Sequence, residues 1–171
     1  YRHDHLPVDY IISPEQEVAR AIINRLHVPG AMDSIPFTDE KLKVIEVRCG
    51  DECPLLNNTI ETVLWHADGL SMSIVLIVRN GDLIFATPQE KLQVDDELFF
   101  VAPSQNVSEI MSLFGHEERE ARRVLIIGGG NIGMSIAQLL ENEEHEINTK
   151  LIELNRERAE YVAARLPGTT V

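Results

Sequence analysis

The chain has 171 residues, of which 44% are hydrophobic and 25% are charged. This balance is typical of a folded globular protein with one domain or two small ones, and it excludes an intrinsically disordered chain. The formal net charge of -13 argues against nucleic acid or anionic lipid as the main partner, because both bind positively charged faces. Any phosphate that the protein binds must therefore be held locally, by backbone N–H groups and a helix dipole.

Apolar runs are short throughout the chain. The longest cover residues 74–78 and 98–102, whereas a membrane-spanning helix needs about 20 apolar residues. Because no signal peptide is visible, we expect a cytosolic protein. The sequence has no initiator Met and starts within what reads as a folded region, so we also expect an internal fragment of a longer protein.

The two cysteines, Cys49 and Cys53, are too few for a disulfide framework. With His66 they could suggest a metal site, but a C-x3-C pair lacks the second pair of ligands that structural zinc requires. We therefore predict two reduced thiols and no metal. No Ser/His/Asp or Cys/His arrangement forms a recognisable motif, so we predict no catalytic residue.

The first part of the chain, residues 1–38, predicts a strand, a helix and a loop. Ser13 followed by Pro14 suits a helix N-cap with proline at the first helical position, and apolar residues recur at helical spacing up to Leu26. A strand followed by a helix is typical of the end of an α/β domain. The predicted elements are the strand at residues 8–12, the helix ended by His27-Val28-Pro29-Gly30, and the loop at residues 33–39.

Residues 40–116 have a different pattern, with short strands separated by turn residues. Asn80-Gly81 stands between two apolar runs and predicts a type I′ hairpin turn, whose two central residues need positive φ. We expect a compact α+β unit with Trp65 in its core, followed by a polar linker at residues 115–122. The predicted strands are residues 42–49, 73–79, 83–87 and 97–102, and the predicted helices are residues 59–65 and 104–113.

Residues 122–171 predict a βαβ unit whose domain is not completed within the chain. The helical parts have apolar residues at helical spacing, and the strands are apolar runs. The predicted elements are strands at residues 123–127 and 150–154, a tight turn at 128–133, helices at 132–140 and 156–166, and the start of a third strand at 169–171.

The turn at residues 128–133 has the sequence GGGNIG, which contains the G-x-G-x-x-G pattern after a strand and at the head of a helix. In this pattern the first glycine makes the tight turn, the second lets the backbone approach a pyrophosphate, and the third lets helix and strand pack closely. The alternative is a glycine-rich turn that serves packing alone. The residues predicted to hold the phosphates of a nucleotide are Gly128, Gly130, Asn131, Ile132 and Gly133.

Glu153 lies about 20 residues after the last glycine, at the end of the second predicted strand. A carboxylate there can accept both ribose hydroxyls of an adenosine and repels a 2′-phosphate, so it favours NAD over NADP. Arg156 could reach the adenine or a phosphate; the alternative is a solvated position at the start of a helix.

With these features the chain resembles the RCK family, cytosolic regulators of potassium channels and transporters. Three parts carry the resemblance: they look like the end of one nucleotide-binding domain with its crossover helix, the start of the family's small C-terminal-type domain, and the opening of a second nucleotide-binding domain. They are residues 11–15 with 28–31, residues 44–47 with 53–56, and residues 124–133 with 151–153.

The resemblance implies an α/β and α+β fold, in which partial Rossmann-like pieces at residues 1–38 and 122–171 flank a small α+β domain at 40–116. It also implies a regulatory subunit rather than an enzyme, which binds NAD(H), with ATP or ADP as another possible ligand. The implied partner is a Trk-type potassium-translocating membrane subunit at the inner face of the cell membrane. A homo-oligomer, dimer or tetramer, is implied as well.

Two departures from the family pattern concern turns of the small domain, where Asn57 and Asp95 stand in place of the usual glycines. Asn and Asp tolerate the left-handed backbone conformation best among the other residues, so we expect both turns to be kept. Two other functions stay open at this point. One is an NAD-dependent oxidoreductase whose catalytic part lies outside these residues, and the other is a ligand-sensing module of another cation transporter.

Overall fold

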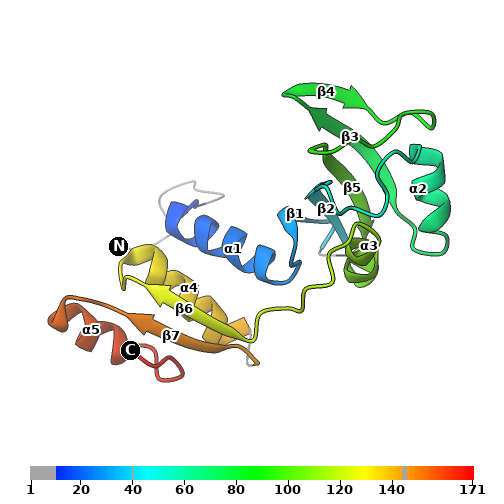
Figure 1. Ribbon diagram of the computed structural model, residues 1–171. Coiled ribbons are helices and arrows are strands. Elements are labelled where there is room, and N and C mark those ends of the chain that lie inside the picture. Colours follow the sequence, from blue (N-terminus) through cyan, green and yellow to red (C-terminus); the bar gives the residue numbers. More distant parts are fainter. Residues whose placement is uncertain (1–10, 40, 144–145) are drawn as a thin grey trace, which may run out of the picture. The chain divides into compact units, whose positions relative to one another are not determined.

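The computed structural model of the protein describes residues 11–39, 41–143 and 146–171. The chain divides into two compact units, which we describe separately (Figure 1). The α/β unit consists of Tyr1–Ile23 with Arg122–Val171, and the small unit consists of Asn24–Ala121. In the described part of the chain, no helix has the length and apolar character needed to cross a membrane.

Helix α1, Pro14–Leu26, confirms the predicted helix near the start of the chain. Its first turn is closed by the Glu17 N–H, which donates to the Ser13 carbonyl over 3.0 Å. Glu15 in the first turn and Arg25 in the last complement the helix dipole. The strand predicted at residues 8–12 falls mostly outside the described residues, and its last two residues, 11 and 12, are not in a strand.

The small unit is a five-stranded antiparallel sheet with two helices on one face (Figure 1). Alternate residues of the central strands point to that face, as Leu98 and Phe100 do, and they are fully buried against the helices. The sheet order is β1-β2-β5-β3-β4. Its strands are β1 (Ala31–Phe37), β2 (Leu42–Arg48), β3 (Ser73–Arg79), β4 (Asp82–Phe85) and β5 (Glu97–Pro103).

The two predicted helices of the small unit are present, and the second begins as a 3-10 turn and not as an α-helix. Thr59 caps α2 (Ile60–His66), since its hydroxyl oxygen accepts the Thr62 N–H over 3.3 Å. A 3-10 turn at Ser104–Asn106 leads into α3 (Val107–Leu113).

The prediction that Trp65 lies in the core is wrong, because its side chain is 73% exposed. The buried face of α2 is formed by Ile60 and Val63, and Trp65 lies two residues further on. Two residues correspond to more than half a helical turn, so Trp65 points away from the sheet.

The prediction of a loop at residues 33–39 is also wrong, because Ala31–Phe37 is the edge strand β1. It pairs antiparallel with β2, from Ala31 opposite Val47 to Phe37 opposite Leu42, and therefore belongs to the sheet of the small unit. Asp33, Ser34 and Pro36 interrupt the apolar alternation that would have indicated a strand. Proline is tolerated here because an edge strand leaves one row of N–H groups unpaired.

Three turns of the small unit use positive φ angles as predicted. Asn80 and Gly81 have φ of 52° and 86° and join β3 to β4, with Arg79 opposite Asp82, which confirms the two-residue hairpin. Asn57 and Asp95 have φ of 63° and 65°, so both turns that usually carry glycine keep the left-handed conformation.

The α/β unit confirms the predicted βαβ order. Its two strands are parallel, and Thr170 forms a parallel bridge with Lys150 where the start of a third strand is predicted. The helices bury one face of this sheet, with Ile126, Leu140 and Leu151 in the core. The elements are β6 (Arg123–Ile127), α4 (Asn131–Glu143), β7 (Asn148–Ile152) and α5 (Arg156–Ala163).

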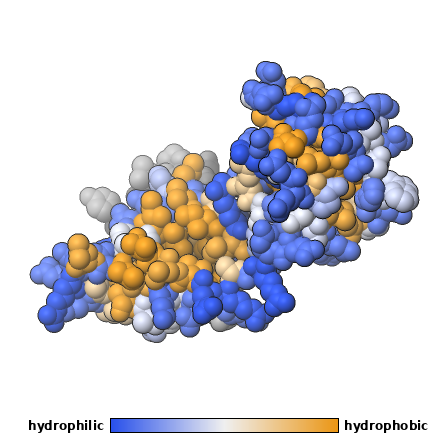
Figure 2. All heavy atoms as spheres, viewed as in Figure 1, coloured by the Kyte–Doolittle hydropathy of each residue, from blue (hydrophilic) through white to orange (hydrophobic). Residues whose placement is uncertain are grey.

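Apolar side chains on the α/β unit are exposed beside this core. Leu125 and Ile127 of β6 are 58% and 81% exposed, Ile152 at the end of β7 is 56% exposed, and Leu154, two residues after β7, is 100% exposed. Figure 2 shows hydrophobic side chains gathered over the part of the molecule that contains these strands. Parallel sheets are normally covered on both faces, whereas the described elements bury only one face of this sheet.

Candidate functional site

The glycine-rich turn links β6 to α4, and each of its pattern glycines meets a different requirement. Gly128 has a φ of 104°, which few other residues adopt, and its N–H donates to the Ile152 carbonyl of the neighbouring strand over 2.8 Å. A Cβ on Gly133 would collide with the carbonyl oxygen of Gly128, so helix and strand pack together only without a side chain there. Gly130 is exposed, and a Cβ there would have no atom within 4 Å, so its backbone is open to a ligand.

Glu153 lies directly beside this turn. It follows the last residue of β7, and its carboxylate accepts two backbone N–H groups, from Gly129 over 2.6 Å and from Asn155 over 2.8 Å. The hydrogen bonds from Asn155 and Gly129 lower the pKa of Glu153 below its ordinary value. An ionised, partly exposed carboxylate at the end of this strand can accept ribose hydroxyls.

Gly129, the residue between the first two pattern glycines, is also constrained. A Cβ on Gly129 would lie 3.1 Å from a Glu153 carboxylate oxygen and 3.2 Å from Val162 of α5. The turn and the carboxylate are therefore packed together.

Arg156 is not brought to the turn. Its side chain is 91% exposed and pairs with Glu160 one helical turn later, over 2.9 Å. Arg158 is the cation at the turn, where its Nε donates to the Gly129 carbonyl over 2.6 Å. The sequence carries a signal for this arrangement, because Arg158 and the fully buried Val162 stand four residues apart on one helical face.

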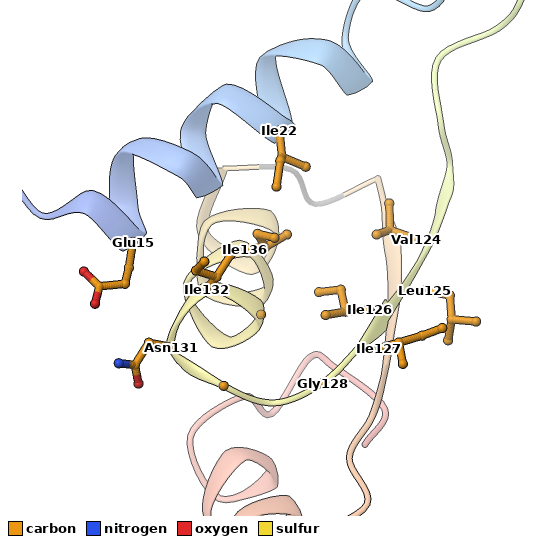
Figure 3. Close-up of a pocket in the computed structure, with 12 residues that line it drawn as sticks. Glu15, Ile22, Val124, Leu125, Ile126, Ile127, Gly128, Asn131, Ile132 and Ile136 are labelled. Carbon is orange, nitrogen blue, oxygen red and sulfur yellow. The ribbon is translucent and has the colours of Figure 1, made fainter.

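An open pocket of about 700 Å³ adjoins the turn (Figure 3). It follows one edge of β6, and α1 contributes Glu15 and Ile22 to its wall. Glu153 is not among the residues that line this pocket. The pocket is lined by Glu15, Ile22, Val124, Leu125, Ile126, Ile127, Gly128, Gly130, Asn131, Ile132, Gly133 and Ile136.

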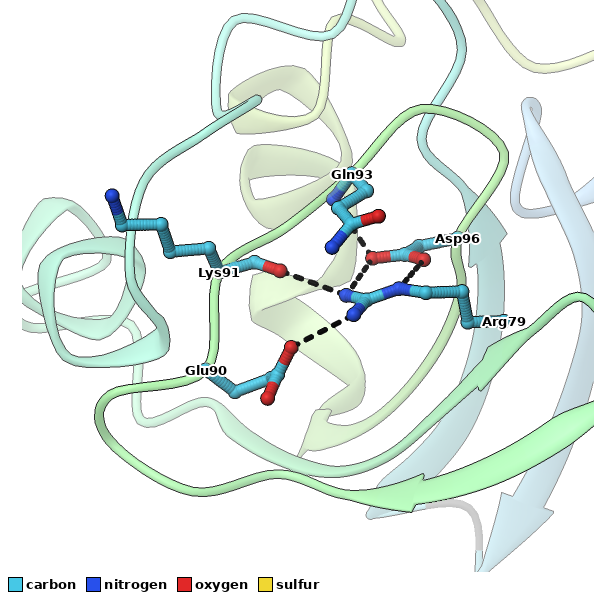
Figure 4. Close-up of polar contacts among 5 residues, drawn as sticks. All are labelled: Arg79, Glu90, Lys91, Gln93 and Asp96. Carbon is cyan, nitrogen blue, oxygen red and sulfur yellow. Dashed lines mark hydrogen bonds and ion pairs between the residues drawn. The ribbon is translucent and has the colours of Figure 1, made fainter.

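A second polar cluster lies in the small unit and has a structural role (Figure 4). The carboxylate of Asp96, whose side chain is fully buried, forms two hydrogen bonds with the Arg79 guanidinium, over 2.7 and 2.9 Å. Arg79 also donates to Glu90 and to the Lys91 carbonyl, and the Gln93 N–H donates to Asp96. Hydrogen bonds to Asp96 and Glu90 raise the pKa of Arg79. Because these groups satisfy one another, the cluster attaches the chain before β5 to β3.

The two thiols are free, and both are buried. Among the residues that the structure describes, no group of three or more His, Cys, Asp or Glu side chains could hold a metal ion.

Fold and site together define a protein that joins a Rossmann-like α/β piece to a small α+β domain. In comparisons with protein families, the TrkA-C domain matches residues 44–115 and the TrkA-N domain matches residues 124–171. The chain belongs to the RCK/TrkA family.

Its relatives include proteins named Trk system potassium uptake protein TrkA. The protein from Azorhizobium caulinodans is 39% identical over 168 residues, which are 98% of this chain and 37% of the relative. The protein from Vibrio alginolyticus is 33% identical over 171 residues, which are 100% of this chain and 37% of the relative. The chain thus spans a little over a third of the length of these relatives.

Among solved structures, the chain is similar to the GsuK RCK domain. The match has a TM-score of 0.46 and 20% identity, and it covers 84% of this chain and 30% of that chain.

Proposed function

We propose that this chain is the nucleotide-sensing part of a regulatory subunit that controls a Trk-type potassium uptake system. The observation that carries the proposal is the position of the Glu153 carboxylate beside the turn at residues 128–133, since the two groups that hold an adenosine and its phosphates are adjacent. The proposed ligand is NAD(H), and ATP or ADP present the same adenosine half.

In this proposal the phosphates lie at the head of α4, where backbone N–H groups of Asn131 and Ile132 start the helix. The ribose hydroxyls of the adenosine donate to Glu153. A 2′-phosphate would add negative charge next to this carboxylate, which disfavours NADP(H). The open pocket along β6 adjoins the same turn, and a second nucleoside can extend into it.

The proposed mechanism is a population shift without chemistry. A bound nucleotide favours one arrangement of the protein by the difference between its affinities for two arrangements. Coupling free energies between sites are typically about 1 to 3 kcal/mol, which changes affinity by roughly 5- to 150-fold. We propose that this coupling reaches a potassium-translocating membrane subunit, and that the protein is cytoplasmic, homo-oligomeric and held at the membrane through that partner.

The proposed domain order follows the same family pattern. Helix α1 would be the crossover helix of a preceding nucleotide-binding domain, and residues 122–171 would open a second such domain. The small unit stands between them.

The test is calorimetric titration of the full-length protein with NADH, NAD, NADPH and ATP. Loss of a hydrogen bond to a charged group costs about 1.5 to 3 kcal/mol, so Glu153→Gln should weaken NADH binding by roughly 10- to 100-fold. Glu157→Ala is the charge-matched control, since Glu157 is exposed in the first turn of α5. Unchanged affinity of Glu153→Gln for NADH would exclude the adenosine role, and hydride transfer from NADH would favour an oxidoreductase.

Variants of Arg156 and Arg158 in α5 test which of the two arginines contributes to nucleotide binding. We propose that Arg158, which contacts the Gly129 carbonyl, supports the bound nucleotide. Arg158→Ala should weaken NADH binding, whereas Arg156→Ala should leave it unchanged because Arg156 is solvated and paired with Glu160. The reverse result would assign the nucleotide contact to Arg156.

A further inference from the structure

Two thiols of the small unit form a close pair that the proposed nucleotide site does not use. Cys49 follows the last residue of β2, and Cys53 closes a turn in which its N–H donates to the Gly50 carbonyl over 3.0 Å. The two Sγ atoms are 3.8 Å apart. The chain has 2 cysteines, so an intramolecular disulfide can only join Cys49 to Cys53.

The local chain can bring the two sulfur atoms into bonding distance. A disulfide has an S–S length of about 2.05 Å, so the atoms must approach by somewhat less than about 2 Å. The residues between the cysteines, Gly50, Asp51 and Glu52, are all exposed. Their side chains lie outside the buried core cluster, whereas Cys49 and Cys53 belong to it, so the approach of the two sulfur atoms moves these two members of the core together with the exposed turn between them.

The environments of the two thiols give them different reactivities. The hydrogen bond between the two thiols, together with the backbone N–H groups of Leu55 and Leu56, lowers the pKa of Cys53 to about 7, although burial opposes this shift. The hydrogen bond with Cys53, burial and the charge of Asp96 raise the pKa of Cys49. Cys53 is 7% exposed and Cys49 is 0% exposed. Cys53 is therefore the thiol that meets a small oxidant first, because the thiolate is the reactive form.

We infer that Cys49 and Cys53 form a reversible redox site, at which hydrogen peroxide oxidises Cys53 and Cys49 then closes an intramolecular disulfide. In the first step the Cys53 thiolate attacks one peroxide oxygen. The S–O bond forms, the O–O bond breaks, and the hydroxide that leaves takes up a proton. In the second step the Cys49 sulfur attacks the sulfur of the sulfenic acid, so that the S–S bond forms and the S–O bond breaks, and the hydroxide takes up the Cys49 proton and leaves as water. The two thiols together lose two electrons, peroxide gains two, and a dithiol reverses the change.

The turn that carries the two cysteines packs against the chain near the end of the small unit. A Cβ on Gly115 would lie 3.2 Å from Pro54 and 3.7 Å from the Glu52 carbonyl, so the thiol turn packs directly on Gly115. Gly115 follows Phe114, the C-cap of α3, and starts the connection to residue 122. Formation of the disulfide therefore changes the conformation of the turn between Cys49 and Cys53, which packs on the start of this connection.

The test is peptide mapping of the full-length protein after exposure to peroxide. The protein is then denatured, free thiols are blocked with N-ethylmaleimide, and trypsin releases a peptide from Cys49 to Arg79, because no Lys or Arg lies between these ends. We expect both maleimide adducts to disappear together from this peptide. The peptide should be lighter than the dithiol form by two hydrogen atoms, and dithiothreitol should restore both adducts.

Single variants separate the two roles. In Cys49→Ser, Cys53 should give a sulfenic acid that dimedone traps, whereas in Cys53→Ser the buried Cys49 should stay reduced. Alanine variants at both positions, with circular dichroism as the folding check, repeat the experiment if serine is not tolerated. The inference is overturned if both thiols keep their adducts while glutathione in the same tube is oxidised. It is also overturned if Cys53 of the unsubstituted protein forms sulfinic acid without a disulfide, or if the disulfide joins two chains.

Discussion

Glu153 is an ionised carboxylate held by backbone N–H groups, which fixes the pH range in which it can act. Its folded-state pKa lies below the unfolded value of about 4.3. The stabilisation that it contributes is therefore complete above about pH 5 and is lost as the pH falls through the lowered pKa.

Nucleotide affinity should follow the same dependence. Calorimetry should show constant affinity for NADH from pH 8 to about pH 5, with a loss only at more acidic pH. Circular dichroism at each pH separates this loss from acid unfolding. A decrease that already begins between about pH 7 and pH 6 would point to a histidine instead, since its ordinary pKa is about 6.5.

At the scale of an element, the contact between β6 and α4 depends on the missing side chain of Gly133. Because a Cβ there meets backbone that cannot rotate away, Gly133→Ala should lower the free energy of unfolding of the α/β unit by about 1 to 3 kcal/mol. Gly130→Ala is the matched control, since its added methyl group enters open space. It should keep stability and weaken NADH binding. Urea denaturation and calorimetry measure the two effects, and equal stability of both variants would contradict this account.

The attachment of β3 to the chain before β5 depends on the buried pair of Arg79 and Asp96. Removing one partner of a buried pair typically costs about 3 to 5 kcal/mol, because the other charge stays buried and unpaired. Arg79→Met should therefore destabilise the small unit by roughly that amount in urea denaturation. Arg48→Met breaks the pair with Glu97, where Arg48 is 50% exposed, and should cost less than about 1 kcal/mol. Similar costs for the two variants would show that the cluster around Asp96 contributes no special stability.

At the scale of the whole molecule, the two units should unfold in separate transitions. Each has its own buried residues, and the last residues of the small unit, 117–121, have no regular structure, although helix α1 runs across the other boundary between the units, after Ile23. In this 171-residue chain, hydrogen exchange should show earlier opening of β6 and β7 than of β2 and β5. The physical reason is that Leu125, Ile127 and Leu154 are left exposed to water. Arg79→Met should shift only the transition of the small unit, and one shared transition would contradict the division.

Local signals predicted most elements, and the exceptions have identifiable causes. The Asn80-Gly81 turn, the proline start of α1 and the strand-glycine-helix pattern are local, so their consequences appear within a few residues. The edge strand β1 has no such signal, because its polar residues and proline become compatible with a strand only through pairing with β2. The exposure of Trp65 could not be read from its apolar character, since it depends on which face of α2 meets the sheet.

By itself, the sequence determined the βαβ order, the glycine pattern and the carboxylate at the end of the second strand, because these depend on backbone conformation and spacing along the chain. Only the tertiary structure decided which arginine meets the turn. Arg156 and Arg158 are chemically equivalent, and the packing of α5 directs one toward Gly129 and the other to solvent. It likewise brought Cys49 and Cys53 to 3.8 Å and Arg79 to Asp96, since such distances depend on how a turn or loop packs against the sheet and helices.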